Sequence, residues 1–171
     1  MKKVLIVEDE ILARLGLRQL VDWRKLELEL LPDATDGEEA LEMIRNSCPD
    51  IILLDLNIPK VSGLEILEFL KKEEMPTKVI VVSCQEEFDV VKKAMKLGAY
   101  DYLRKLNLSS DELENILEKC LVETEERITV HMQGIREIRY EEIVRDSRDI
   151  LAGACNYCLL YTSPSPRDRS L

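Results

Sequence analysis

Short apolar runs alternate with amphipathic segments of helix length through the first two thirds of the chain, and this alternation limits the fold more than any other feature. Three runs, at residues 4–7, 51–54 and 79–82, are unbroken aliphatic blocks, which is typical of parallel strands covered on both faces. Two more mixed runs, at 29–34 and 99–103, suit the edges of a sheet. The chain therefore predicts five strands in one parallel sheet.

The segments between these runs carry the residue spacing of amphipathic helices. Asp36 and Ser110 are N-cap candidates, Gly98 ends the fourth helix, and prolines 49 and 76 follow the second and third. With right-handed crossovers, five βα units predict an α/β fold of the flavodoxin-like (βα)5 kind, a doubly wound parallel five-stranded sheet in the order 2-1-3-4-5. The predicted helices cover residues 11–21, 38–45, 64–72, 88–97 and 113–121.

Composition narrows the function classes. The 171 residues suffice for one domain and a short extension, and their formal charge is −10. Up to Arg127 there are 18 basic and 28 acidic residues, and after it 6 of each, so the acidity belongs to the front domain. Such a surface repels phosphate backbones and does not suit nucleic-acid binding. No apolar segment is long enough to cross a bilayer, and five scattered cysteines suggest reduced thiols, so we expect no membrane partner and a cytoplasmic location.

Polar residues follow the apolar runs at the points where the strands end. Glu8 and Asp9 follow the first run, Asp55 follows the third and Ser83 the fourth. The fifth run is accompanied by Tyr102 and Lys105. Ligands of doubly wound sheets bind at the carboxyl ends of the strands, so we expect these side chains to converge on one crevice.

Three converging carboxylates imply a cation, because two unit charges about 4 Å apart repel by roughly 4 kcal/mol at an effective dielectric near 20. Oxygen ligands without histidine or cysteine suit Mg²⁺, which commonly binds carboxylates, waters and a phosphate. If Asp55 attacks phosphorus, an acyl phosphate forms on its carboxylate. Ser83 and Lys105 would then hold the phosphoryl oxygens. Taken singly, the acidic residues could simply cap the next helix, and the lysine could be a solvated charge.

Residues 1–122 resemble the receiver domain of two-component response regulators. The resemblance rests on the opening VLIVEDE, on IILLDLNIPKVSGLEIL, on VIVVSCQEEFDVVKKAMKLGAYDYLRK, and on the spacing between them. It implies a phosphoacceptor module that is not an enzyme and that receives its phosphoryl group from a sensor histidine kinase. A face formed by the fourth helix, the fifth strand and the fifth helix would be the output surface, and a candidate homodimer interface.

The resemblance assigns a role to each residue of the constellation. Asp55 resembles the phosphoacceptor, and Glu8 and Asp9 resemble the magnesium-binding acidic pair, with the main-chain carbonyl of Asn57 as a further ligand. Ser83 and Lys105 resemble the catalytic hydroxyl and lysine that sense the phosphoryl group. Together with Ser83, Tyr102 resembles the aromatic switch.

Three positions depart from the family pattern. The acidic pair is Glu8-Asp9 rather than the commoner Asp-Asp, and we expect it to retain the metal. Leu106 replaces the proline after the lysine, so no cis peptide bond is expected there. Cys84 stands where the family has a smaller residue, and we expect it to narrow the access to Asp55 and slow phosphoryl exchange.

The remainder of the chain divides into two predicted segments. Residues 123–157 predict a helical linker toward a missing output domain, because receivers with this sequence block and a long linker resemble those of AraC-type transcriptional regulators. DNA would be a partner only through that missing domain. Residues 158–171 include CLLYTSPSPRD, which back-translates to a string that resembles a transposase-derived sequencing adapter, so we interpret them as a non-native tail. A native disordered Ser/Pro/Arg tail is the alternative.

Two other functions are compatible with the same constellation. The first is a stand-alone receiver that acts by protein–protein interaction. The second is a magnesium-dependent phosphohydrolase with an aspartyl-phosphate intermediate. Such hydrolases use a second acid two residues after the nucleophile, and here that position is Asn57, which favours slow self-dephosphorylation over turnover.

Overall fold

Five parallel strands form one sheet in the part of the chain that this computed structural model describes, residues 1–84 and 87–123. Their order is β2-β1-β3-β4-β5, and every neighbouring pair is parallel. The predicted fold class and strand order are thereby confirmed. The strands are β1 (Lys2–Val7), β2 (Leu28–Leu30), β3 (Ile51–Leu54), β4 (Lys78–Ser83) and β5 (Asp101–Arg104).

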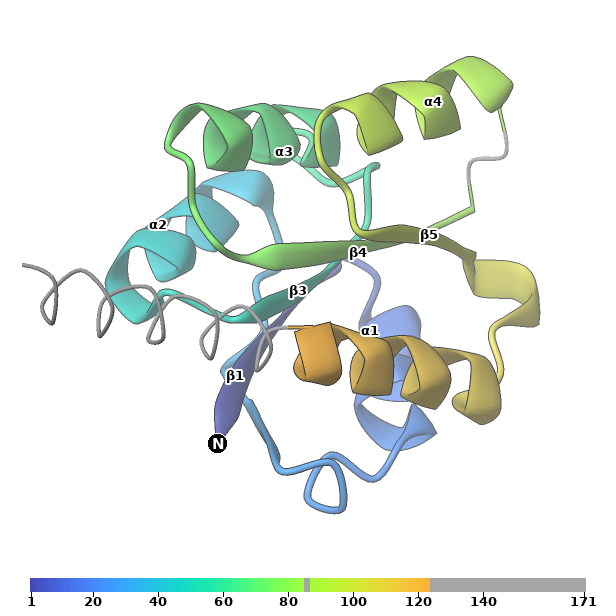
Figure 1. The fold of residues 1–171 in the computed structure, drawn as a ribbon. Helices are drawn as coiled ribbons and strands as arrows, with labels where there is room; N and C mark the ends of the chain where they lie inside the picture. Colours follow the sequence, from blue (N-terminus) through green and yellow to red (C-terminus); the bar gives the residue numbers. More distant parts are fainter. Residues whose placement is uncertain (85–86, 124–171) are drawn as a thin grey trace, which may run out of the picture. The chain divides into compact units, whose positions relative to one another are not determined.

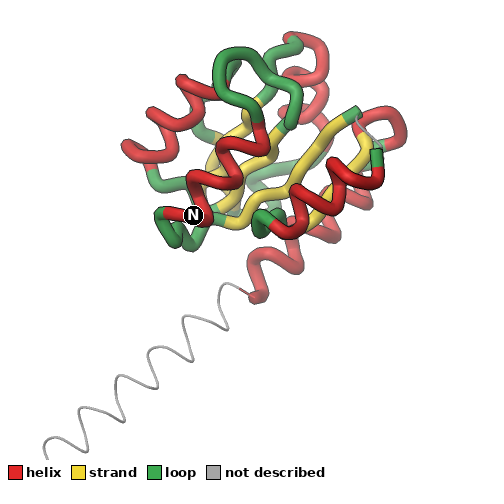
Figure 2. The backbone as a smooth tube through the Cα atoms, turned by 90° about the horizontal axis from the view of Figure 1, so that it is seen from above, coloured by secondary structure: helices red, strands yellow, loops and turns green. Residues whose placement is uncertain are grey.

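Helices cover both faces of this sheet, as the doubly wound topology requires (Figure 1). Figure 2 gives the view from above, in which the strands run between the two helical layers. On one face lie α2, α3 and α4; on the other lie α1 and a last helix over residues 110–123 (Figure 1). The helices are α1 (Ile11–Leu20), α2 (Gly37–Ser47), α3 (Gly63–Lys72) and α4 (Phe88–Lys96), and a short 3₁₀ turn, η1 (Lys105–Asn107), follows β5.

Two apolar clusters, one on each face of the sheet, form the core. All four residues of β3 are buried, and none is more than 2% exposed. They alternate between the clusters: Ile52 and Leu54 pack with α2, α3 and α4, whereas Ile51 and Leu53 pack with α1 and the last helix. This alternation follows from the two-residue period of a strand, and it explains why the central strands are continuous aliphatic blocks.

Several helix ends follow the predicted sequence rules. Asp36 caps α2, because its carboxylate accepts a hydrogen bond from the Glu39 N–H at 2.9 Å. Gly98 has a φ of 98° just after α4, a left-handed conformation that glycine adopts without strain. The prediction for Ser110 was wrong, because the helix begins at that residue and the hydroxyl of Ser109 accepts the hydrogen bond from the Glu112 N–H at 3.2 Å.

The second strand is shorter than predicted. The expected run at 29–34 pairs with β1 only through Leu28–Leu30, and Ala34 returns to the sheet as an isolated bridge to Val7. Pro32 lies between the two contacts and has no N–H to donate to a ladder. The chain therefore leaves the sheet after β2 and touches the end of β1 once more.

Within the described residues, no helix has the length and apolar character needed to span a membrane. Apart from its first residue, the predicted linker over 123–157 lies outside the described residues, as does the whole of the predicted tail over 158–171. These two predictions, and the domain boundary at 122, stay predictions.

Candidate functional site

The carboxyl ends of β1, β3 and β4 bring the buried polar residues of the described chain together. Glu8, Asp55 and Ser83 are 1%, 6% and 1% exposed, and each lies at the end of one of these strands. The register explains this, because Val7 of β1 is paired with Leu54 of β3. The residues that follow these two positions are therefore neighbours at one edge of the sheet.

A cavity of about 430 Å³ opens at this edge. Six of the seven residues that the sequence singled out for the site line this cavity, and Tyr102 is the exception. The residues that line the cavity are Glu8, Asp9, Glu10, Asp55, Asn57, Ser83, Cys84 and Lys105. The arrangement agrees with the rule that ligands of doubly wound sheets bind beyond the carboxyl ends of the strands.

Three carboxylates and one ammonium group dominate the electrostatics of the cavity. One carboxylate oxygen each of Glu8, Asp9 and Asp55 lies within 4.8 Å of the other two. The Nζ of Lys105 is 2.6 Å from Glu8 Oε2 and 2.6 Å from Asp55 Oδ2. This single cation balances only part of the negative charge, so the cavity retains an excess of negative charge.

Two groups in the cavity, Glu8 and Lys105, have raised pKa values, and the causes differ. Burial is the cause for Glu8. It raises the pKa of Glu8 above its ordinary value, and the hydrogen bond and charge of Lys105 oppose this rise without cancelling it. Burial alone would lower the pKa of Lys105, but its hydrogen bonds to Asp55 and Glu8 outweigh that effect, and the pKa is raised. Lys105 therefore stays cationic at neutral pH.

The donor set fits a divalent cation with a preference for oxygen. Glu8 Oε2 is buried, and its partner among the described residues is the ammonium group of Lys105 at 2.6 Å. Three carboxylates without histidine are ligands that Mg²⁺ accepts. Glu8, Asp9 and Asp55 are the side chains that would hold such an ion. Asn57 is exposed, and its N–H donates to Asp55 Oδ1 at 3.2 Å.

The remaining predicted residues differ in how they relate to the cavity. Ser83 ends β4 and is buried at the cavity, and Cys84 beside it is exposed and also lines the cavity. Tyr102 lies on β5, is half-buried and packs against the apolar cluster that includes α4. Leu106 is 77% exposed and does not line the cavity.

The sequence analysis missed a glycine that the loop after Asp55 requires. A Cβ atom on Gly63 would lie 2.6 Å from the Asp55 carbonyl oxygen and 2.6 Å from the Leu56 Cα. The Gly63 N–H donates to the Leu56 carbonyl at 3.1 Å. The first turn of α3 thus packs directly against the backbone of Asp55, and only a residue without a side chain allows this approach.

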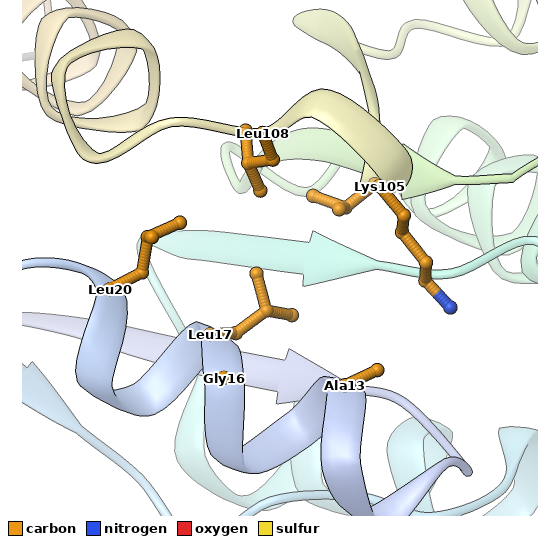
Figure 3. Close-up of a pocket in the computed structure, with 7 residues that line it drawn as sticks. Ala13, Gly16, Leu17, Leu20, Lys105 and Leu108 are labelled. Atoms are coloured by element: carbon orange, nitrogen blue, oxygen red, sulfur yellow. The ribbon is translucent and has the colours of Figure 1, made fainter.

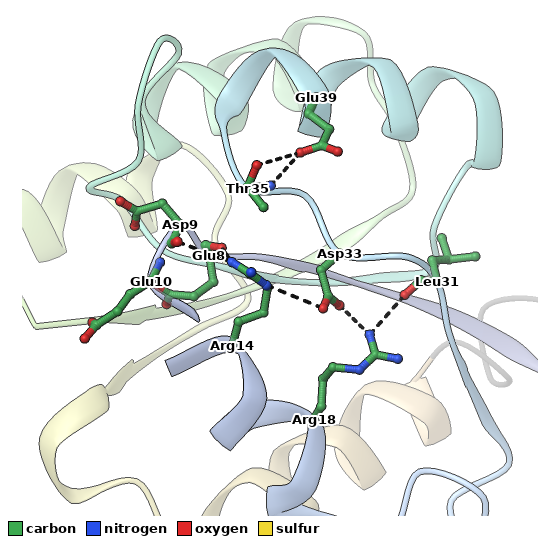
Figure 4. Close-up of polar contacts among 9 residues, drawn as sticks. All are labelled: Glu8, Asp9, Glu10, Arg14, Arg18, Leu31, Asp33, Thr35 and Glu39. Carbon is green, nitrogen blue, oxygen red and sulfur yellow. Dashed lines mark hydrogen bonds and ion pairs between the residues drawn. The ribbon is translucent and has the colours of Figure 1, made fainter. Parts of the chain in front are cut away.

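The sequence analysis also missed a group of charged residues behind the acidic pair (Figure 4). Arg14, on α1, donates hydrogen bonds to the carbonyl oxygens of Glu8 and Asp9. Asp33, which follows β2, forms ion pairs with Arg14 and with Arg18. Arg14 and Arg18 are four positions apart in α1, so the sequence alone places them one turn apart on the same side of the helix. No local pattern, however, identifies Asp33 as their partner.

A second cavity, of about 220 Å³, lies on the other side of Lys105 and is largely apolar (Figure 3). The lysine lines both cavities, and in Figure 3 its ammonium group points away from the labelled leucines. The stem of the side chain thus packs on apolar surface while the charge reaches the carboxylates. The lining residues are Ala13, Gly16, Leu17, Leu20, Val82, Lys105 and Leu108.

Sequence comparison assigns this doubly wound sheet, with its acidic cavity and lysine at the carboxyl edge, to a known family of domains. The family model of the response regulator receiver domain matches residues 4–118. The chain belongs to this family, and it is therefore a receiver domain of two-component systems with further residues after it. The predicted resemblance is confirmed.

Individual relatives agree with the family assignment. An uncharacterized response regulatory protein of Staphylococcus epidermidis is 33% identical over 118 residues, which are 69% of this chain and 46% of that protein. The uncharacterized transcriptional regulatory protein YesN of Bacillus subtilis is 30% identical over 82% of this chain and 38% of its own length. This chain thus spans less than half the length of these two relatives.

Solved structures show the same fold. The receiver domain of AraT, a response regulator from Geobacillus stearothermophilus, is similar with a TM-score of 0.67 and 32% identity. The similarity covers 74% of this chain and 97% of that domain.

Proposed function

We propose that this receiver accepts a phosphoryl group on Asp55 from a sensor histidine kinase in a Mg²⁺-dependent reaction. The observation that carries the proposal is the pair of contacts from Lys105 Nζ to Asp55 Oδ2 and Glu8 Oε2. They join a nucleophilic carboxylate, an acidic metal-binding residue and a cation at one open cavity. Phosphoryl transfer needs positioning and charge stabilisation, and these groups supply both.

Asp55 is positioned for nucleophilic attack by the residues around it. The N–H of Asn57 holds Oδ1, Lys105 holds Oδ2, and the close approach of Gly63 fixes the backbone. Attack of a carboxylate oxygen on phosphorus forms an acyl phosphate and releases the histidine of the donor. A bound Mg²⁺, held by Glu8, Asp9 and Asp55, supplies neutralisation of charge on the transferring group.

The signal would then pass from Asp55 to the face formed by α4, β5 and the last helix. Phosphorylation adds nearly two negative charges, and the hydroxyl of Ser83 and the ammonium group of Lys105 are the donors that would turn toward them. Tyr102 would rotate into the space that Ser83 leaves. Phe88 and Met95 are exposed apolar side chains of α4, and the proposal assigns them to the docking of a second copy.

Transcriptional control through a DNA-binding domain is the proposed output. Its support comes from relatives: the match to the transcriptional regulatory protein YesN extends over 141 residues, beyond the 115 residues of the receiver model. The proposal also assigns the chain to the cytoplasm. Thiols stay reduced in that compartment, and the described residues form no disulfide bond.

The test is phosphorylation of the full 171-residue chain by acetyl phosphate with Mg²⁺, followed by intact-mass measurement. We expect one adduct of about 80 Da, the mass of one phosphoryl group, that is lost in Asp55→Asn and in the presence of a chelator. Asp50→Asn is the matched control, because Asp50 pairs with Lys2 at the opposite edge of the sheet. An adduct that persists in Asp55→Asn would overturn the assignment of the acceptor.

The switch is tested on the same phosphorylated sample. Light scattering coupled to size exclusion measures whether phosphorylation changes the oligomeric state, and Phe88→Ser would weaken any dimer formed through the proposed face. A phosphorylated dimer that is unaffected by Phe88→Ser would exclude this face.

A further inference from the structure

The loop that carries Glu8 and Asp9 is held from behind by one side chain of α1. Arg14 Nη1 is 2.8 Å from the Glu8 carbonyl oxygen and 3.3 Å from the Asp9 carbonyl oxygen (Figure 4). Each carbonyl belongs to a rigid, planar peptide unit. Because two successive units are fixed by one donor, the direction in which the Asp9 side chain leaves the backbone is fixed as well.

Arg14 is itself held in place. It lies in the first turn of α1, where its N–H donates to the Glu10 carbonyl at 3.0 Å. Its Nε is 3.7 Å from Asp33 Oδ2, and the side chains of Arg14 and Asp33 are only 17% and 16% exposed. A charged contact with so little exposure is screened less by solvent than a surface ion pair.

The position of Asp33 follows from the strand order. Since β2 is the neighbour of β1, the chain that leaves β2 passes the end of β1, and the Glu8 N–H donates to the Ala34 carbonyl at 3.0 Å. Arg18 pairs with Oδ1 of Asp33 and lies 3.4 Å from the Leu31 carbonyl, so it fixes Asp33 from the other side. The two arginines thus share one carboxylate, but only Arg14 contacts the acidic pair.

We propose that Arg14 is a positioning residue for the divalent-cation site, acting through the backbone of Glu8 and Asp9. The inference rests on the proposed function, because it takes these carboxylates to be the metal ligands. Three carboxylates within 4.8 Å repel each other, and an unanchored loop would relax away from Asp55. Groups that orient metal ligands from outside the ligand shell commonly change metal affinity by 10-fold or more.

A purely electrostatic role of Arg14 predicts the opposite result. Removal of a positive charge near an acidic site makes the site more negative and should tighten cation binding. Anchoring predicts weaker binding when the same charge is removed. Arg14→Gln therefore separates the two effects by the sign of the change.

The experiment measures Mn²⁺ binding to the full chain by calorimetry or electron paramagnetic resonance, with Mn²⁺ as an oxygen-preferring probe. We expect Arg14→Gln to weaken binding by about 10-fold. Arg14→Lys keeps the charge but loses the planar guanidinium group, so its affinity for Mn²⁺ should lie between those of the wild type and Arg14→Gln. Arg18→Gln is the matched control, because it removes the same charge from the same helix and leaves the carbonyl contacts of Arg14 intact; its affinity should stay within about twofold of wild type.

A second measurement monitors the loop without metal. The Glu10 N–H donates to Glu8 Oε1 at 3.2 Å, so its amide hydrogen exchange monitors the order of the loop. We expect faster exchange in Arg14→Gln and no change in Arg18→Gln, while circular dichroism shows that both variants are folded. This result distinguishes a local loss of order from global destabilisation.

The outcomes are distinguishable. Equal or tighter Mn²⁺ binding in Arg14→Gln overturns the inference and leaves the proposed function intact, as does an equal loss in Arg14→Gln and Arg18→Gln. Wild-type protein that binds no Mn²⁺, or binding that Asp55→Asn and Glu8→Gln leave unchanged, overturns both the inference and the metal site of the proposed function.

Discussion

Strand β3 and the residue that follows it both lie in the interior, but they use burial differently. Ile51–Leu54 are apolar and at most 2% exposed, so their removal from water stabilises the fold. Asp55, the next residue, is 6% exposed and lies within 4.8 Å of two further carboxylates. Burial there costs free energy that one lysine offsets only in part.

Strand β3 and the residue after it thus meet different requirements, stability in the strand and chemistry at its end. The apolar residues of the strand specify the fold, whereas the carboxyl edge of the sheet keeps charges close together and thereby lowers stability. For Glu8 the cost takes the form of a raised pKa, because the effect of burial exceeds that of the contact with Lys105. Substitutions in the two regions should therefore change stability in opposite directions.

The largest effect is expected in the interior. Ile52 is fully buried in the middle of β3, and Ile52→Ala should lower the free energy of unfolding by about 3 to 4 kcal/mol, because it loses transfer energy and leaves a cavity. Urea denaturation measures this loss. Glu29→Ala, at an exposed position of β2, is the control and should change stability by no more than about 0.5 kcal/mol. A loss below about 1 kcal/mol at Ile52 would contradict the packing described.

The next largest effect is expected at Gly63, where the first turn of α3 packs against the backbone of Asp55. Gly63→Ala would place a Cβ 2.6 Å from the Asp55 carbonyl oxygen, so the loop must move, at a cost of about 2 kcal/mol. Phosphorylation of Asp55 should slow as well, because its backbone shifts. Gly16→Ala is the matched control: a Cβ there meets no atom within 4 Å, and a helix-interior alanine should add about 0.5 to 1 kcal/mol. Equal stability changes in the two variants would refute the close approach.

The sequence predicted the fold and most of the cavity because both depend on short-range patterns. Aliphatic blocks identify β1, β3 and β4, and a polar residue after each block must lie at the same edge once the strands are parallel. Glu8, Asp55 and Ser83 were found in this way. Their chemical roles are a separate matter, and these roles remain proposals.

Contacts between residues distant in sequence could not be predicted in the same way. Arg14 and Asp33 are 19 positions apart, and their contact depends on how the chain leaves β2 after Pro32. That departure also shortened β2 relative to the predicted run at 29–34. The requirement for Gly63 was equally hidden, since it arises from the angle at which α3 approaches the backbone of Asp55.

A substitution in the cavity should stabilise the protein. In the absence of metal, Glu8→Gln removes one of three clustered charges and should raise the free energy of unfolding by about 1.5 kcal/mol at neutral pH, part of a gross repulsion of roughly 3 kcal/mol per pair. Saturating Mg²⁺ should reverse the order, because only the wild type binds it fully. Urea denaturation with and without Mg²⁺ tests both statements.

The raised pKa of Glu8 predicts the sign of a pH dependence in the same variant. The folded state raises the pKa of Glu8 above the ordinary 4.5, so the native protein binds this proton more tightly than the unfolded chain does. The wild type therefore loses stability as the pH rises from 4.5 through the folded pKa, and Glu8→Gln lacks this loss. The difference between the two proteins should close as the pH falls below 4.5; a difference that persists there would have another cause.

The smallest effect concerns the start of the last helix, which does not line the acidic cavity. Ser109→Ala should cost about 1 kcal/mol, because the Ser109 hydroxyl accepts from the Glu112 N–H at the start of the helix over residues 110–123. Ser110→Ala removes only a hydrogen bond to Glu114 one turn along, and should cost about 0.3 kcal/mol. Thermal unfolding of the two variants ranks them, and the reverse order would restore Ser110 as the cap. Neither variant should alter Mn²⁺ affinity, because this helix contributes no residue to the acidic cavity.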